Sequence, residues 1–497
     1  MKRIATLFMS VVLLSSVLIA PANAVVNIGD RCSKNGMVFA KYLICKKVKG
    51  KLVWQMNKIK ESVAASIWPD TAGTICAADP NVPKEWAEYE IFAMKMFHCS
   101  RPLRFQDVAL PSVKPKTTLT PINPNVEPCK IDPVGQGSTV VLRPNRWKFS
   151  GDLNIPIIPI QFRDYPTDKK PGDEYREYFK YLKEMFYKIS DGNTRINFIV
   201  PDKYFDIGAT IESYVIPGVV SENDGRFNWK QMDVPKYTKD VFAVADKNID
   251  FTGIDMAVHV VPFNTPNTYI PHNQTFRMDF IQTNEGVVDF NYLWPVPAWT
   301  DDMAWYGAEP FLHLHEFFHA NGLLDDHYGD NFGQSGPNQG TGNWGNMSGM
   351  VTDFIVWDKW IASMVKDSQI ICTDPKVTTT SWLKPMEYFG DYEKMLVVPI
   401  SRTKAIAIES HRAGGMNFKL NKASQGALVY LINSEDTRHG FGINVVKPSN
   451  RKTIYGDRFF VLADAPLKLN ESVTLEGYKI TVVEAGTFGD VVKVEKV

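Results

Sequence analysis

The 497-residue sequence has no excess charge of either sign, because 55 Lys and Arg residues balance 55 Asp and Glu residues. Nucleic-acid partners require a basic surface, so this balance gives no reason to expect one. Long apolar runs are also lacking. The run Val11–Ala20 is shorter than the about 20 residues of a membrane-spanning helix, and no later segment reaches that length. We therefore expect no membrane span. The sequence does not indicate an oligomeric state.

The N-terminus has the three parts of a secretory signal peptide. The basic residues Lys2 and Arg3 precede the apolar run, and the small residues Ala22 and Ala24 follow it. We expect cleavage after Ala24. Residues 1–24 would then be a signal peptide, and the mature chain would be a secreted, extracellular protein.

The pattern Cys-x-x-Cys, which is typical of zinc sites with thiolate ligands, is absent. All six Cys follow the expected cleavage site, and an even set in an oxidising compartment favours three disulfides. Proximity in the sequence pairs Cys32 with Cys45 and Cys76 with Cys99, which leaves Cys129 for Cys372.

Histidine is scarce, yet four of the nine His residues lie within 313–327. His315 and His319 have the spacing i and i+4, which puts both imidazoles on one face of a helix and lets them bind one metal ion. Glu316 completes the pattern His-Glu-x-x-His, in which the glutamate is the general base toward the attacking water. A chance match in this chain has odds of about one in a hundred. The pattern therefore predicts a zinc site with Glu316 as a catalytic residue.

The third zinc ligand follows after a turn. Gly322 lacks a Cβ, so it can end the helix in left-handed geometry and reverse the chain. We expect this turn to bring Asp325 to the metal, because the extended pattern places its third ligand at that spacing. His327 is the competing third ligand. Three protein ligands leave a position for water, as in catalytic rather than structural zinc sites.

Residues beyond Asp325 are candidates for other roles in the site. Peptide hydrolysis forms an oxyanion that needs a donor, and His327 and Tyr328 are the nearest candidates. Both residues can equally be supporting or surface groups. Asp326 and Asp330 are candidate ligands for Ca²⁺, or solvated residues of the loop.

Three segments in this order resemble the immune inhibitor A family of secreted bacterial zinc metallopeptidases. Residues 315–330, HEFFHANGLLDDHYGD, are similar to the family's extended zinc motif, and residues 342–349, GNWGNMSG, are similar to its Trp-x-x-Met-Ser segment. Residues 353–360, DFIVWDKW, resemble the family's helix that carries a Trp and a basic residue. The resemblance implies a Met-containing turn beneath the zinc and hydrolysis of peptide bonds in proteins.

The sequence departs from the family pattern at three positions. Phe318 stands where the family usually has Gly, Leu324 where it has Pro, and His327 where it commonly has Tyr. The bulk of Phe318 next to the ligand helix requires that the neighbouring strand be arranged to admit it.

The length exceeds that of one ordinary domain, so we expect several. Apolar runs predict strands at 154–162, 196–200 and 256–261. Helical patterns predict helices at 173–189, with Asp173 as its cap, and at 237–248. The expected fold class is an α/β (α+β) zincin or metzincin-like catalytic domain flanked by β modules. The expected parts are a disulfide-stapled β module at 25–60, a helical segment and Pro-rich linker at 61–130, the catalytic domain at 131–375 and a β-sandwich at 376–497.

We therefore expect a secreted zinc metalloendopeptidase that acts on protein or peptide substrates through Glu316. Two alternatives remain open. In the first alternative, the chain is a secreted binding protein whose zincin domain is inactive. In the second, it is a zinc amidase that acts on cell-wall peptide. The intact Glu316 argues against the first of these, because an inactive relative would more often lose the base or a ligand.

Overall fold

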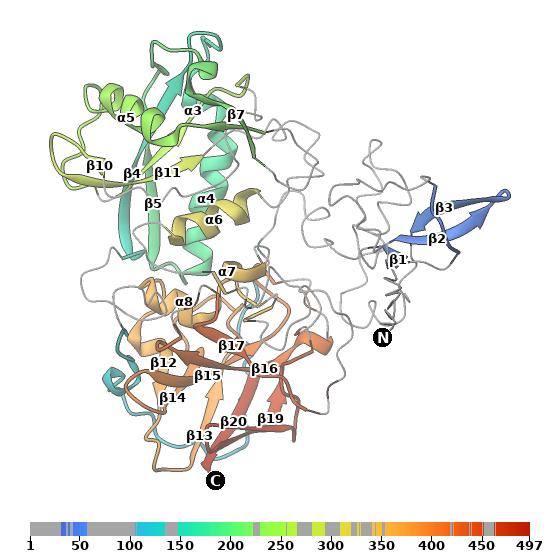
Figure 1. The fold of residues 1–497 in the computed structure, drawn as a ribbon. Coiled ribbons are helices and arrows are strands. Elements are labelled where there is room, and N and C mark those ends of the chain that lie inside the picture. Colours follow the sequence, from blue (N-terminus) through green and yellow to red (C-terminus); the bar gives the residue numbers. More distant parts are fainter. Residues whose placement is uncertain are drawn as a thin grey trace, which may run out of the picture. The chain divides into compact units, whose positions relative to one another are not determined.

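The computed structural model describes part of the N-terminal region and most of the chain after residue 105 (Figure 1). The described residues are 31–35, 38–39, 43–56, 105, 107–134, 148–221, 229–254, 256–265, 281–293, 309–319, 326–327, 329, 340–342, 344–349, 353–417, 420, 422–436, 438, 440–449, 451, 462 and 464–497. The predicted signal peptide and the predicted pair Cys76–Cys99 lie outside these residues. No helix among them is long and apolar enough to cross a membrane.

The described N-terminal residues form a unit of their own, within Met1–Lys58. Strands β1 (Val38–Phe39), β2 (Leu43–Val48) and β3 (Lys51–Met56) make an antiparallel sheet in the order β1-β2-β3. Lys49 and Gly50 connect β2 to β3 with positive φ angles of 46° and 84°, as a tight two-residue hairpin requires. The predicted disulfide between Cys32 and Cys45 is confirmed.

The second unit contains a six-stranded sheet, in the upper part of Figure 1. Its order is β10-β11-β9-β4-β5, with β6 beside β4, and every pair is parallel except β10 with β11. The bounds are β4 Gly151–Gln161, β5 Thr194–Ile199, β6 Phe205–Asp206, β9 Met256–Val260, β10 Ile281–Gln282 and β11 Val287–Leu293. Strands β7 (Val215–Ser221) and β8 (Trp229–Met232) form a separate antiparallel pair.

Both faces of this sheet are covered, which explains why β4 is apolar along most of its length. Ile155 and Ile157 belong to the same core cluster as helix α4 (Arg176–Ile189), while Ile158 and Ile160 share a second cluster with α5 (Val234–Ala245). Adjacent residues of a strand point to opposite faces, so one apolar run supplies two cores. The active-site candidate helix α6 (Glu309–His319) contacts both α4 and β11.

The predicted cap at Asp173 is wrong. A short helix, α3 (Pro171–Glu174), begins two residues earlier with Lys170 as its N-cap residue, and Asp173 lies inside it. Proline fits the first turn of a helix because that turn leaves its N–H groups unpaired. Pro171 therefore starts the helical region, and Tyr175 separates α3 from α4.

Two sheets make up the C-terminal part, and their strands are antiparallel except for one pair. Five strands have the order β12-β14-β15-β16-β17, and four have the order β13-β20-β19-β18. The first sheet starts before residue 376, because β12 pairs with β14. The strand bounds are β12 Ile370–Cys372, β13 Thr379–Leu383, β14 Met395–Pro399, β15 Lys404–His411, β16 Gly426–Asn433, β17 Ile443–Val445, β18 Ser472–Leu475, β19 Tyr478–Gly486 and β20 Gly489–Lys496.

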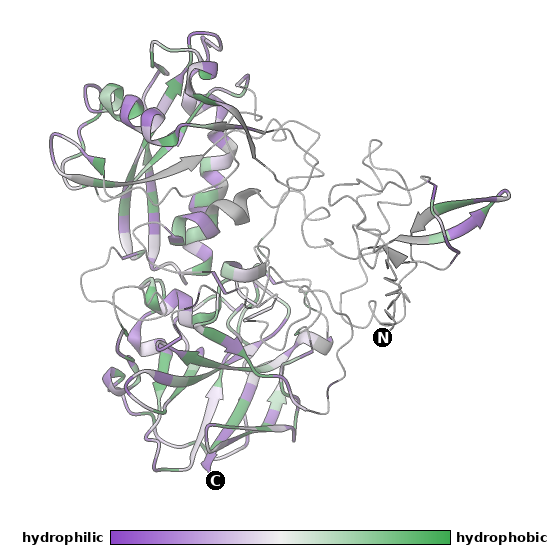
Figure 2. Ribbon diagram, in the orientation of Figure 1, coloured by the Kyte–Doolittle hydropathy of each residue, from purple (hydrophilic) through white to green (hydrophobic). Residues whose placement is uncertain are grey.

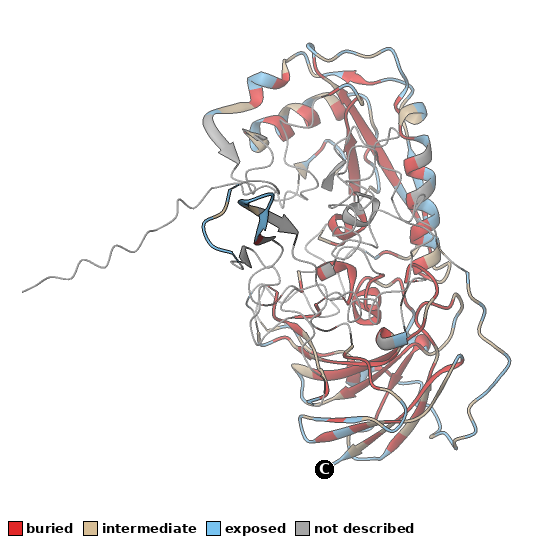
Figure 3. Ribbon diagram, turned by 90° about the vertical axis from the view of Figure 1, so that its right-hand side faces the viewer, coloured by how far each residue is buried: buried red, intermediate tan, exposed pale blue. Residues whose placement is uncertain are grey.

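The five-stranded sheet is buried on both faces. Leu396 and Val398 of β14 point into an apolar core that is shared with the four-stranded sheet, so the two sheets form a sandwich. Apolar residues recur along these strands in Figure 2, and buried residues recur along them in Figure 3. Met395 and Val397 point the other way, into the core cluster that also contains Phe317 of α6. The C-terminal sheets therefore share a core with the helix that carries the candidate site.

Residues 107–134 form an extended strap along these sheets. The carboxylate of Glu484 accepts hydrogen bonds from the backbone N–H groups of Lys116 (2.9–3.0 Å) and Thr117 (2.9 Å). The predicted disulfide between Cys129 and Cys372 is confirmed and ties the end of the strap to β12. The region that was expected to be a linker is thus bound to the sandwich over this length.

Replacing both Cys129 and Cys372 with Ala should lower the free energy of unfolding. The bridge spans 243 residues of sequence, and closing so long a loop contributes on the order of 5 kcal/mol in the chain-entropy model. Chemical denaturation of wild type and variant measures the difference. The matched control replaces Cys32 and Cys45, which bridge only 13 residues in the other unit. An unchanged denaturation midpoint in the Cys129/Cys372 variant would contradict the prediction.

His411 should make stability depend on pH. It is 2% exposed, with Nδ1 2.7 Å from Glu387 Oε1 and Nε2 2.9 Å from Glu409 Oε1. Burial lowers the pKa of His411, but the two carboxylates outweigh burial and raise it to about 9. The stabilisation is therefore complete below the unfolded-state pKa of about 6.5 and is lost as the pH rises through about 9, on the order of 3 kcal/mol in all.

Denaturation of wild type and His411→Gln at several pH values tests this. The stability advantage of the wild type should shrink between pH 6.5 and 9.5. A constant advantage across that interval would show that His411 does not carry the charge.

Candidate metal centre

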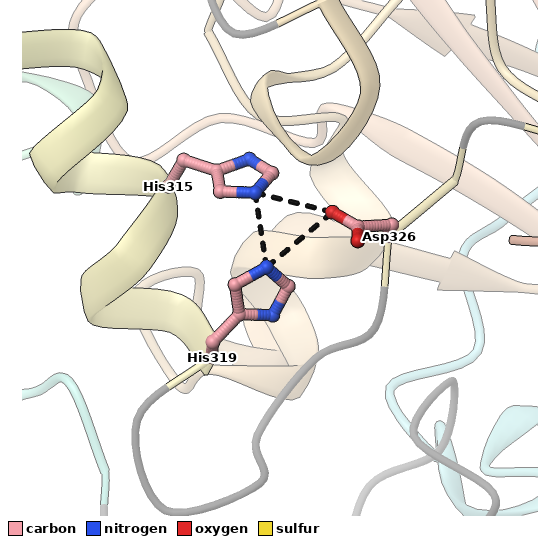
Figure 4. Close-up of side chains that lie close together, drawn as sticks. All are labelled: His315, His319 and Asp326. Atoms are coloured by element: carbon pink, nitrogen blue, oxygen red, sulfur yellow. Dashed lines mark hydrogen bonds and ion pairs between the residues drawn. The ribbon is translucent and has the colours of Figure 1, made fainter. Parts of the chain in front are cut away.

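Helix α6 presents His315 and His319 on one face, one turn apart. Their Nε2 atoms are 2.9 Å from each other, and their rings meet edge to face with centroids 4.6 Å apart (Figure 4). His315 is 2% exposed, whereas the side chain of His319 is 23% exposed. One histidine is therefore fixed in the core, and the other borders solvent.

Asp326 completes a three-residue group with the two histidines. Its Oδ1 lies 3.1 Å from His315 Nε2 and 3.3 Å from His319 Nε2. One ligand atom from each of the three residues lies within 4.8 Å of the others, close enough to hold one metal ion. Asp325, which the spacing predicts as the third ligand, lies outside the described residues.

The donor set fits zinc. Two imidazole nitrogens and a carboxylate oxygen are zinc ligands of catalytic type, and tetrahedral ligands about 2.0–2.1 Å from zinc are about 3.3 Å apart. The three observed separations, 2.9, 3.1 and 3.3 Å, are close to that spacing.

A backbone carbonyl sets the tautomer of His315. The short helix α7 (Asn346–Gly349) follows the candidate loop, and the carbonyl oxygen of Asn346 lies 2.9 Å from His315 Nδ1. A carbonyl can only accept, so Nδ1 carries the proton and the lone pair of Nε2 faces the group. This support is typical of histidine ligands in metalloproteins.

The electrostatics keep Asp326 charged. Burial raises the pKa of its carboxyl group, but the contacts with His315 and His319 outweigh burial and lower the pKa below its ordinary value. A deprotonated carboxylate is the form that binds a metal ion.

Glu316 is next to His315 in α6 and is buried, with 8% of its surface exposed. The bulky Phe318 packs against two aromatic residues that lie outside the strands. Its ring stacks on Phe149 at 4.9 Å and on Phe354 at 3.9 Å between centroids. These contacts fix the helix that carries both histidines and Glu316.

Among the described residues, His327 is not a member of the group of three. Its Nε2 lies 3.0 Å from Asp358 Oδ1 in helix α8 (Val356–Ile361), and both side chains are fully buried. The structure therefore brings His315, His319 and Asp326 together and pairs His327 with Asp358. Tyr328 and Asp330 lie outside the described residues.

Sequence reasoning missed three contributors to this arrangement. Asp326 was expected only as a candidate Ca²⁺ ligand or a solvated residue, and it lies beside both histidines. The carbonyl of Asn346 carries no sequence signal, because any residue supplies one. Asp358 lies in a segment that was noted for its Trp and basic residues, and only the fold shows that it meets His327.

No protein-family model matches this chain, and no curated protein matches it. The geometry described above is therefore the main support for a function.

The neighbouring residues Asp325 and Asp326 allow a matched test of the third ligand. Asp326→Asn should raise the dissociation constant for Zn²⁺ by more than the about 10–100-fold typical of a group that only supports a ligand. Asp325→Asn should leave it near the wild-type value. Competition with a chromophoric chelator measures both constants. The reverse result would show that the extended pattern gives the right ligand and that the Asp326 geometry does not persist when metal binds.

Proposed function

We propose that this chain is a zinc-dependent metallopeptidase that hydrolyses peptide bonds in proteins. The convergence of His315, His319 and Asp326 in α6 and the following loop carries this proposal. The resemblance of residues 315–330 to the immune inhibitor A motif supports it. A secreted location is part of the same proposal and is supported by the two disulfides and the N-terminal sequence.

His315, His319 and Asp326 would hold the zinc ion. Zinc bound there would supply Lewis-acid chemistry, because it lowers the pKa of water to about 7 and polarises a carbonyl group.

Glu316 would act as the general base. Its carboxylate would accept a proton from the water that attacks the carbonyl carbon, and would pass that proton to the leaving amine. Burial supports this role, because a carboxylate with little solvent contact interacts more strongly with a nearby proton donor.

The sheet edge beside α6 supports an extended peptide as substrate. Residues 289–293 of β11 pair with β9 on one side, whereas β10 pairs only with Val287 and Val288 on the other. Among the described residues, 289–293 therefore have no strand partner on their outer side. A peptide can add to such an edge through main-chain hydrogen bonds, which recognise any protein sequence.

Glu316→Gln should lower cleavage of a mixed unfolded-protein substrate by about 10²–10⁴-fold, the usual contribution of a general base. The zinc content of the variant should stay near one ion per chain, so that lost activity is not lost metal. Glu184→Gln, which removes an exposed carboxylate from α4, is the charge-matched control and should retain full activity. A metal chelator should abolish activity in all three proteins.

Equal activity of Glu316→Gln and wild type would refute the proposed role of Glu316. Zinc-loaded wild type that cleaves neither protein nor cell-wall peptide would favour the binding-protein alternative. Cleavage of cell-wall peptide alone would favour the amidase.

A further inference from the structure

The loop that carries Asp326 is held by its backbone on both sides. The N–H of His327 donates to the carbonyl of Met347 in α7 at 2.9 Å, and the carbonyl of His327 accepts from the N–H of Thr341 at 3.0 Å. Gly340, with a φ of +53°, makes this approach feasible, because a Cβ there would lie 1.9 Å from the His327 carbonyl oxygen. The residue directly after Asp326 is thus fixed in place.

Consecutive carbonyl groups of α7 bind the two segments that carry the candidate ligands, helix α6 and the Asp326 loop. Asn346 binds the imidazole of His315, and Met347 binds the backbone of His327. The distance between Asp326 and His315 is therefore set through one short helix. A shift of the loop relative to α7 would change that distance.

The side chain of His327 adds an anchor inside the core. Its contact with Asp358 at 3.0 Å joins two side chains that are each 0% exposed. Asp358 makes no other side-chain hydrogen bond to the described residues. A buried pair of this kind has one well-defined geometry. If either group moved away, the other would be left buried without the partner that offsets its loss of solvation.

The helix that carries Asp358 is itself fixed from the C-terminal sheet. Glu409 of β15 accepts a hydrogen bond from the N–H of Val356, the first residue of α8, at 2.8 Å. The same oxygen of Glu409 also accepts from the hydroxyl of Tyr430 at 2.9 Å. Helix α8, which carries the partner of His327, is therefore hydrogen-bonded to the five-stranded sheet of the sandwich.

We propose that the buried His327–Asp358 pair positions the Asp326 carboxylate for metal binding. Because Asp358 engages Nε2 of His327, we assign His327 the role of a positioning residue and not that of a ligand or an oxyanion donor. This inference rests on the proposed metal centre.

Asp358→Ala removes the partner of His327 without altering a candidate ligand. We expect its dissociation constant for Zn²⁺, measured by competition with a chromophoric chelator, to rise about 10–100-fold. Asp358→Asn keeps an oxygen at the same place and should lie between this variant and wild type. The visible spectrum of Co²⁺-loaded protein, which reports the ligand arrangement, should change in Asp358→Ala.

Asp353→Ala is the matched control for lost stability. Asp353 lies just before α8, is 4% exposed and is paired with Lys359, but it has no contact with the Asp326 loop among the described residues. This control should unfold more easily and yet keep the wild-type zinc affinity and Co²⁺ spectrum.

A second variant separates the loss of the positioning contact from the destabilising effect of an unpaired buried charge. Replacing both His327 and Asp358 with Leu removes the pair and leaves no unpaired charge in the core, an exchange that is often neutral for stability. We expect a stably folded protein with weakened zinc binding. A wild-type affinity for Zn²⁺ in this double variant or in Asp358→Ala would overturn the positioning role but would leave the proposed metal centre standing. A wild-type protein that binds no Zn²⁺ would instead refute the metal centre and the proposed function with it.

Discussion

Hydrogen bonds to the short helix α7 are the constraint on which the candidate site depends. Its first two carbonyls accept hydrogen bonds from His315 and from the backbone N–H of His327, so the same four residues position both segments of the candidate metal centre. The helix is secured in turn by Ser348, whose hydroxyl donates to the carbonyl of Gly342, and by Trp344, whose indole N–H donates to the carbonyl of Leu462 at 2.8 Å. Preorganisation of this kind lowers the cost of gathering ligands around a metal ion.

The C-terminal sandwich serves the site as a scaffold. The ring of Trp344 lies 4.6 Å from that of His411, which is flanked by Glu387 and Glu409, and Glu409 also fixes the start of α8. Charged groups in such a core hold one geometry only while all partners are present. Buried contacts therefore connect the C-terminal sheets to the segments that hold the candidate site, although they are far apart in the sequence.

Regular elements were predictable from the sequence, while the loop geometry was not. The apolar run at 154–162 marks β4, because a strand that is covered on both faces needs no polar positions. The i, i+4 spacing likewise brings His315 and His319 together in α6. The identity of the carboxylate beside them depends on a loop path, and spacing alone cannot distinguish Asp325 from Asp326. His327 shows the same limit, since its burial against Asp358 depends on a helix 31 residues later.

Anomalous scattering at the zinc edge from crystals of the zinc-loaded chain would test the metal centre most directly. We predict one strong peak bonded to His315 Nε2, His319 Nε2 and a carboxylate oxygen of Asp326. A zinc ion bound elsewhere, or no zinc in the presence of excess metal, would contradict the proposed centre and the function that depends on it.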